Sequence, residues 1–228
     1  MLNKILKSKA WPVLGQFIYT LLVLLGLPVL VWGLEALPAF FANPVRLTFA
    51  AIVFVQALIN AWLVAISPPE PYHEPRFDVS HWHSHVFEAI VALAAFGDRR
   101  DILTWNQNNI VRWVGLGVYL TGLALSIWSE YSWIKHLRTE SALVLDRPVL
   151  ISEGPYKLIR YPSLLYLIFY SLGFALLFRS WTGIALMIPL LGGIVSRINN
   201  LEKIFAVQYK KIWPLRRHTS KRLIPYLY

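Results

Sequence analysis

Two apolar runs separated by one short break decide the fold. The chain reads YPSLLYLIFYSLGFALLF over residues 161–178 and SWTGIALMIPLLGGIVS over residues 180–196, so runs of 18 and 17 residues flank Arg179. A helix that crosses a hydrocarbon core of about 30 Å needs about 20 apolar residues at about 1.5 Å each. Because Arg179, Ser180 and Trp181 form the only polar or interfacial break, this stretch predicts a tight antiparallel hairpin of two membrane helices.

Three further uncharged runs precede this hairpin, and a shorter sixth candidate lies near Val86–Phe96. The three runs are Ala10–Leu34, Leu47–Pro69 and Trp113–Ser129. Of the 228 residues, 57% are hydrophobic and 15% are charged, which lies outside the usual balance of a soluble domain. The sequence therefore predicts an all-α, polytopic transmembrane helical bundle with five or six spans. We expect one integrated membrane domain, with N-terminal helices and interfacial loops in residues 1–143 and a distinct C-terminal region in residues 144–228.

The charge of the chain is positive and concentrated near its C-terminus. The 22 basic and 12 acidic residues give a net charge of +10, and residues 197–228 hold eight Lys or Arg against Glu202 alone. In a hydrophobic chain, basic flanks mark the cytoplasmic side and anionic headgroups, so we expect cytoplasmic termini, membrane lipids as partners and no nucleic acid. Three aromatic residues of this tail are interpreted as headgroup anchors: Trp213, Tyr226 and Tyr228. With six spans, three basic residues fall on the opposite side as an exception: Arg99, Arg100 and Arg112.

A proline-broken segment precedes the hairpin. Gly154 permits a positive φ and Pro155 lacks an amide donor, so the pair stops any preceding helix and fixes a turn at the membrane surface. Pro162 suits the first turn of the next helix, where a missing donor is harmless. The start of that helix presents free amides and a partial positive charge, and Arg160 adds a planar cationic fork. These groups favour a carboxylate or another anionic ligand, and Glu202 is the candidate acid of the same site.

The order of motifs in the C-terminal region resembles that of a known superfamily. From Leu150 the chain reads LISEGPYKLIRYP, and after the hairpin follow Arg197, Glu202, FAVQY at residues 205–209 and RLIP at residues 222–225. This order resembles the C-terminal half of the isoprenylcysteine carboxyl methyltransferase and phospholipid methyltransferase superfamily of integral membrane enzymes, over residues 144–225. The matching residues are Gly154, Pro155, Tyr156, Arg160, Pro162, Phe205, Tyr209 and Pro225.

The sequence departs from the pattern of this superfamily at several positions. Tyr161 stands where the superfamily has histidine, Leu164 where it has tyrosine, and Ala206 where it has glycine. Arg197 and Ile198 occupy the spacing expected for a pair of glutamates. The resemblance is therefore stronger for the fold than for the activity.

The resemblance implies transfer of a methyl group from S-adenosylmethionine to a lipophilic acceptor at the cytoplasmic membrane face. Helix-terminal amides and Arg160 suit the carboxylate of the methyl donor, Tyr156 or Tyr161 suits its adenine and ribose, and Glu202 suits ribose hydroxyls or the sulfonium. Methyl transfer itself needs mainly in-line approach and desolvation. Arg160 and Glu202 are the candidate catalytic residues. The candidate cofactor-binding residues are Gly154, Pro155, Tyr156, Arg160, Tyr161, Pro162 and Glu202.

Two other functions remain open for the same region. Replacement of the histidine and of both glutamates fits a member that has lost catalysis and acts as a subunit or assembly factor of a membrane complex. A nicotinamide-dependent membrane reductase of the sterol reductase type is the second alternative, because such reductases also carry an Arg-His-Pro element. Without the surrounding motif, Arg160 would mark the edge of a span and Glu202 would be a solvated residue beside the membrane.

Metal ligands are scarce in this sequence. The chain has no cysteine, which excludes disulfides, thiolate metal sites and cysteine nucleophiles. On a helix His81, His85 and Glu88 would share a face, whereas in an extended segment His81, His83 and His85 would align. Histidines at a membrane interface are usually hydrated, so no metal site is predicted.

Overall fold

The described part of the chain is built from helices. The computed structural model describes residues 2–68, 82–140, 151–210, 213, 214, 217 and 220–223. The long helices are α1 (Leu2–Leu21), α4 (Pro44–Ile66), α5 (Trp82–Arg100), α6 (Asn109–Glu140), α7 (Pro162–Leu177) and α8 (Trp181–Gln208). The shorter elements are η1 (Leu22–Gly26), α2 (Leu27–Trp32), η2 (Leu34–Ala36), α3 (Leu37–Ala42) and η3 (Gly154–Lys157). These residues contain no β-strand, which confirms the predicted all-α fold.

Four of the described helices are long and apolar enough to cross a membrane: Lys9–Trp32, Pro44–Ile66, Asn109–Arg138 and Trp181–Val207. They correspond to the first three predicted runs and to the second run of the hairpin. α7 has 16 residues and is therefore about 24 Å long, because Pro162 begins it and the turn at Arg179 follows it. α5 holds the sixth predicted segment in a helix of 19 residues. A span count above these four helices stays a prediction.

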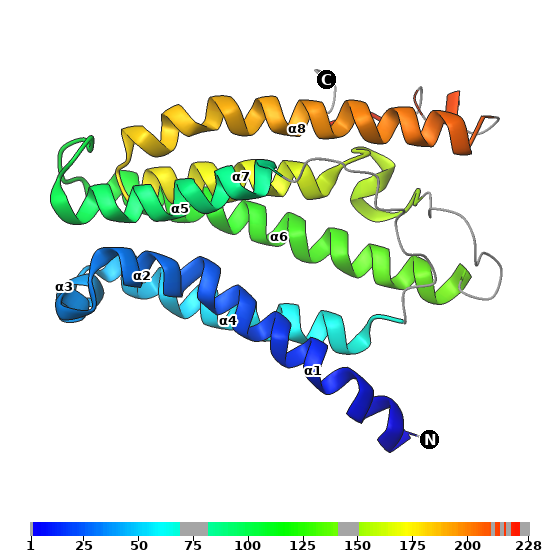
Figure 1. Cartoon of the computed structure of the whole chain (residues 1–228), viewed down its shortest axis with the longest axis horizontal. Coiled ribbons are helices and arrows are strands. Elements are labelled where there is room, and N and C mark those ends of the chain that lie inside the picture. Colours follow the sequence, from blue (N-terminus) through cyan, green and yellow to red (C-terminus); the bar gives the residue numbers. More distant parts are fainter. Residues whose placement is uncertain are drawn as a thin grey trace.

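The helices pack side by side, and the two helices of the predicted hairpin are neighbours. α1 lies against α4, α6 against α7, and α5 against α8 (Figure 1). α7 and α8 run antiparallel on either side of the turn at residues 178–180, which confirms the predicted hairpin. The start of α7 and the end of α8 lie at the same end of the bundle as the N-terminus. The chain reversals at residues 33–43, 101–108 and 178–180 lie at the opposite end.

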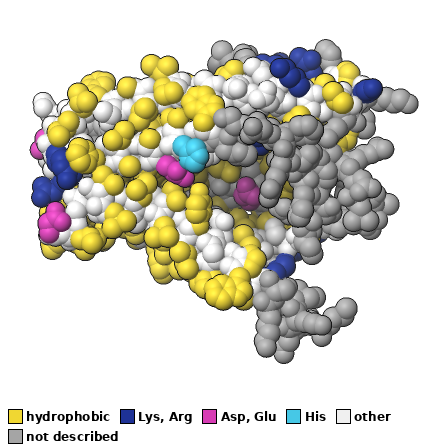
Figure 2. Space-filling view, in the orientation of Figure 1, with side chains coloured by type: hydrophobic (Ala, Val, Ile, Leu, Met, Phe, Trp, Pro, Cys, Tyr) yellow, Lys and Arg dark blue, Asp and Glu magenta, His cyan; other side chains and the backbone are white. Residues whose placement is uncertain are grey.

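The outer surface of the bundle is strongly apolar. Trp11, Ile110 and Ile188 are each more than 70% exposed. Hydrophobic side chains cover much of the described part of the face in Figure 2, and the basic side chains drawn there gather toward its two ends. Such a surface is suited to contact with lipid, with its charges near the headgroups.

A buried ion cluster holds together the end of the bundle that lies away from residue 160. Asp98, near the end of α5, has no exposed side-chain surface. Its carboxylate lies 3.0 Å from Arg46 Nη1, 2.7 Å from Arg112 Nη2 and 2.7 Å from Arg179 Nε. Each guanidinium also donates to a backbone carbonyl. The carbonyls of Phe40 and Leu177 lie in the last turns of α3 and α7, and that of Trp105 lies in the connection between α5 and α6. Asp98 with its three arginines is called the Asp98 cluster below.

The Asp98 cluster buries two arginines that the sequence places at turns between spans. With six spans, the sequence predicts Arg112 on the outer side together with Arg99 and Arg100; in the structure Arg112 lies in the first turn of α6 and is 1% exposed. Arg179 is not a simple interfacial break, because it is 2% exposed and adopts a φ of +52°. The cause is the Asp98 carboxylate, which compensates for removing these guanidinium groups from water.

The middle of the bundle combines aromatic packing with one set of polar contacts. Phe49, Tyr119 and Phe174 meet in edge-to-face pairs with ring centroids 5.2–5.7 Å apart. The Tyr119 hydroxyl donates to Gln56 Oε1 at 2.5 Å, and Gln56 Nε2 donates to the Tyr170 hydroxyl at 3.2 Å. These contacts connect α4 with α6 and α7, and they satisfy polar groups that are removed from solvent.

Candidate functional site

The Gly-Pro-Tyr motif forms a tight turn against α6. Gly154 has a φ of +56°, and a Cβ atom there would overlap the Ser132 hydroxyl, so both backbone conformation and space require glycine. The amides of Leu158 and Ile159 donate to the Pro155 carbonyl at 3.1 and 2.9 Å. The predicted turn is therefore present as the 3₁₀ element η3.

The residues that follow this turn pair with the C-terminal tail. Ile159 and Lys221 form a short parallel bridge. The Arg160 amide donates to the Lys221 carbonyl at 2.7 Å, and the Lys221 amide donates to the Leu158 carbonyl at 3.0 Å. The tail is thereby held beside the start of α7, which begins at Pro162 as predicted.

Glu202 joins the turn, α8 and the tail through two arginines. Arg160 Nη2 lies 3.1 Å from Glu202 Oε1. Arg222 binds the same carboxylate with both branches of its fork, with Nε 3.1 Å from Oε1 and Nη2 2.7 Å from Oε2. Two guanidinium groups thus face one carboxylate, so these three side chains carry a net positive charge. Arg160, Glu202 and Arg222 are called the Glu202 cluster below.

Polar atoms beside Glu202 remain without a partner. Arg160 Nε, Arg160 Nη1 and the Tyr161 hydroxyl are buried and have no hydrogen-bond partner among the described residues. The Arg160 side chain is 8% exposed and Tyr161 is 7% exposed. Burial lowers the pKa of Arg160, and the charge of Glu202 opposes this effect. Because buried donors normally have acceptors, this corner of the fold is suited to an additional anionic group.

An aromatic pair lies beside the Glu202 cluster. The guanidinium of Arg160 lies 5.7 Å from the ring centroid of Trp213, and this ring stacks on Phe205 with centroids 5.1 Å apart. Trp213 is 4% exposed, so its interpretation as an exposed headgroup anchor is wrong. The other two predicted anchors, Tyr226 and Tyr228, lie outside the described residues. No sequence pattern places Trp213 near Arg160, because the residues that follow α8 have no periodic pattern.

The predicted site residues fall into two neighbouring groups. Arg160 and Tyr161 lie with Glu202, whereas Gly154 and Tyr156 pack on α6. The ring centroid of Tyr156 is 6.4 Å from that of Trp133. The turn therefore reaches from the surface of α6 to the Glu202 cluster, and Tyr156 belongs to the side of the turn that faces α6. The sequence includes Arg222 only in the final RLIP motif, and its bidentate contact with Glu202 adds it to the site.

The histidines considered as an alternative metal site do not gather in the described structure. His85 Nδ1 lies 3.4 Å from Glu88 Oε2 at an exposed surface of α5, whereas His83 is 6% exposed. His81 lies outside the described residues. Within the described ranges, no three His, Asp or Glu side chains are placed to hold a metal ion.

Comparison with known proteins found no match to this chain. No family model matches the sequence, and no curated protein or solved structure shows significant similarity to it. The candidate site therefore rests on its residues and their geometry, and the superfamily resemblance stays a prediction.

Proposed function

We propose that the chain is an S-adenosylmethionine-dependent methyltransferase that acts on a lipophilic acceptor at the membrane surface. The observation that carries the proposal is the unpartnered part of Arg160 and the Tyr161 hydroxyl, buried beside Glu202 at the start of α7. A helix start with a neighbouring guanidinium fork favours a carboxylate. The order of motifs in the sequence, which resembles that of the methyltransferase superfamily, suggests that this carboxylate belongs to S-adenosylmethionine.

The residues present fit the amino-acid end of the methyl donor. Arg160 would bind its carboxylate through Nη1, and the Tyr161 hydroxyl would donate a further hydrogen bond. When bound, S-adenosylmethionine supplies an electrophilic methyl group to the site. Trp213 and Phe205 offer an apolar wall that keeps water away from this region.

Glu202 takes a different role from the one the sequence suggests. Both of its carboxylate oxygens already accept from arginines of the same chain. We therefore propose that Glu202 orients Arg160 and holds the tail against α8, instead of binding ribose or sulfonium directly. This assigns Glu202 as a positioning residue of the site.

Basic residues at this end of the bundle support a cytoplasmic location of the site. Lys203, Lys210 and Arg217 lie exposed near the end of α8 and along the tail. Because such residues favour the cytoplasmic leaflet, both termini are proposed to be cytoplasmic, with the acceptor arriving from the surrounding lipid.

One observation favours a second function, that of a non-catalytic subunit or assembly factor of a membrane complex. Both oxygens of the Glu202 carboxylate are bound by arginines of the same chain, so Glu202 needs no ligand to complete its contacts. An acidic side chain of a protein partner could then accept hydrogen bonds from the unpartnered nitrogens of Arg160.

Ligand binding by the purified full-length protein in detergent separates these functions. Binding of S-adenosylmethionine, weakened at least about tenfold by Arg160→Ala and unchanged by Arg99→Ala, supports methyl transfer. Arg99 is a matched control because it is an exposed arginine at the other end of the bundle. Binding of a reduced nicotinamide in its place would support the reductase alternative. Binding of neither, with a membrane protein that co-purifies stoichiometrically, would support the subunit alternative.

A further inference from the structure

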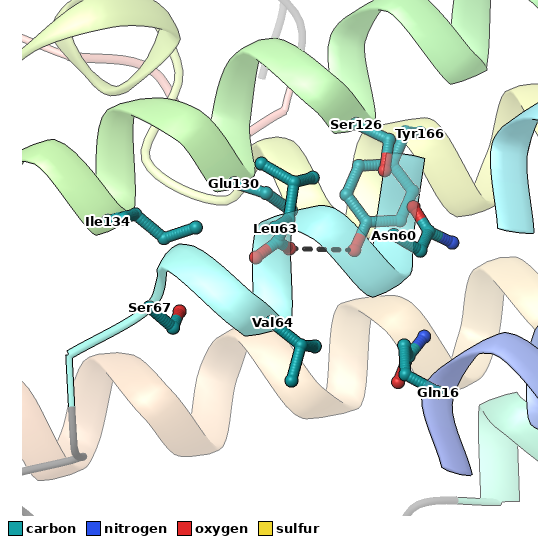
Figure 3. A pocket seen from close by; sticks show the side chains of 9 residues that line it. All are labelled: Gln16, Asn60, Leu63, Val64, Ser67, Ser126, Glu130, Ile134 and Tyr166. Carbon is teal, nitrogen blue, oxygen red and sulfur yellow. Dashed lines mark hydrogen bonds between the residues drawn. The ribbon is translucent and has the colours of Figure 1, made fainter. Parts of the chain in front are cut away.

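A cavity lies between the pair formed by α1 and α4 and the pair formed by α6 and α7. Its volume is about 260 Å³, and Figure 3 shows the side chains that surround it. The polar members of its lining are Gln16, Asn60, Ser67, Ser126, Glu130 and Tyr166. These residues come from all four helices or their ends, so the cavity is a feature of the assembled bundle.

Glu130 is the one acidic or basic side chain in this lining. Its carboxyl group lies 3.5 Å from the Tyr166 hydroxyl, a weak contact that is drawn as a dashed line in Figure 3. Among the described residues, no basic side chain pairs with Glu130. Glu130 lies within the Asn109–Arg138 segment, which is apolar enough to cross the bilayer. An ionisable group in such a segment is costly and generally marks a pathway or a binding site.

The neutral groups of the cavity mainly offer hydrogen-bond acceptors. The amide nitrogens of Gln16 and Asn60 both donate to the Thr20 hydroxyl at 3.3 Å, so the amide oxygens of these two residues can accept. Together with the Glu130 carboxylate, they suit a ligand that donates several N–H bonds and carries a positive charge.

Other cations fit this lining less well. A divalent metal ion takes six or more oxygen ligands and usually several carboxylates, whereas one carboxyl group is present here. A quaternary ammonium group is typically held by a cage of aromatic rings, whereas Tyr166 is the one aromatic ring in this lining. A protonated amine uses both the charge and the acceptors of the cavity.

We propose that this cavity binds the primary ammonium headgroup of a membrane amphiphile, with Glu130 as its counter-ion. The volume equals roughly nine water molecules, taking about 30 Å³ for each, so it holds a headgroup while the hydrocarbon chain stays in the bilayer. The site is separate from the Glu202 cluster, and the inference does not depend on methyl transfer.

Three amphiphiles with the same chain test this proposal on full-length protein in a neutral maltoside detergent. Displacement of radiolabelled hexadecylamine is measured with hexadecylamine, hexadecanol and hexadecyltrimethylammonium. We expect the amine to bind about tenfold more tightly than either analogue, because a charge-assisted hydrogen bond is lost in each case. Equal affinities for all three amphiphiles would overturn the proposal.

Two variants and one control locate the binding. Glu130→Gln should abolish the preference for the amine, and Glu88→Gln, an acidic residue on α5 outside the cavity, should leave it unchanged. Val64→Phe fills the cavity while Glu130 remains, and it should weaken amine binding by about tenfold or more. If Glu130→Gln does not fold, the Val64→Phe result and the preference of the unmodified protein decide the question. An amine preference that survives both cavity variants would place the site elsewhere and contradict the proposal.

Discussion

Replacement of Asp98 by asparagine should destabilise the protein more than any other single change of charge in its described part. The carboxylate binds three arginines whose side chains are 9%, 1% and 2% exposed, at nitrogen–oxygen distances of 2.7–3.0 Å. Asparagine keeps one acceptor oxygen and nearly the same shape, but it removes the only negative charge within hydrogen-bonding distance of Arg46 and Arg112 among the described residues. The variant therefore leaves buried guanidinium groups without a counter-ion.

The magnitude follows from the cost of an unpaired buried charge. Breaking one buried ion pair by removing a partner typically costs about 3–5 kcal/mol, and here three arginines lose the same partner. For a chain of this size, about 1 kcal/mol shifts the unfolding midpoint by roughly 2–4 °C, so we expect a loss of about 6–20 °C. Part of the repulsion can be relieved by water that enters the end of the bundle.

Thermal unfolding of the purified protein in detergent measures this loss, with Asp101→Asn as the matched control. Asp101 also binds Arg179, at 2.8 Å, but its side chain is 68% exposed, so its removal should cost less than about 1 kcal/mol. If Asp98→Asn lowered the unfolding midpoint no more than Asp101→Asn does, the Asp98 cluster would not hold this end of the bundle together.

Three further substitutions test the packing around the candidate site and the core. Gly154→Ala should destabilise by about 1–3 kcal/mol, because its φ is +56° and a Cβ would meet Ser132, whereas Gly117→Ala, which has open space around it in α6, should be neutral or stabilising by up to about 1 kcal/mol in the same unfolding assay. Gly173→Ala should push α7 away from α6, since a Cβ there would lie 2.9 Å from the Tyr119 backbone; a normal unfolding midpoint would contradict this close approach. Tyr119→Phe leaves the buried Gln56 Oε1 without its donor at 2.5 Å and should cost about 1–3 kcal/mol by denaturant unfolding, while Tyr131→Phe at an exposed position should change little.

The sequence was sufficient for the long apolar helices and for one of their pairings. Uncharged runs of sufficient length located the long apolar helices, and the break at Arg179 located the hairpin, because both features are local along the chain. The glycine and prolines of residues 154–162 likewise predicted a turn and a helix start, since their backbone preferences do not depend on tertiary contacts.

The two ion clusters could be identified only from the structure. Arg46 and Asp98 are 52 residues apart, and no local pattern indicates that they meet. For the same reason the sequence indicates Arg112 only as a charge on the outer side and Arg179 only as part of the break between two apolar runs. The cavity around Glu130 could not be predicted from the sequence either, because its polar side chains are single residues distributed over four apolar helices.

The candidate site was partly predictable from sequence. The motif order named Arg160 and Glu202, and the structure places their side chains 3.1 Å apart. It did not indicate that Arg222 binds the Glu202 carboxylate or that Trp213 lies beside Arg160, since both are tertiary contacts between residues far apart in the sequence.

The proposed methyltransferase function requires that the start of α7, the end of α8 and the tail together bind S-adenosylmethionine. Amide hydrogen exchange of the full-length protein, with and without this compound, tests this binding. We expect slower exchange confined to residues 154–165, 200–210 and 220–223, and loss of that protection in Arg160→Ala. Unchanged exchange in these segments at saturating S-adenosylmethionine, or protection confined to another part of the bundle, would contradict it.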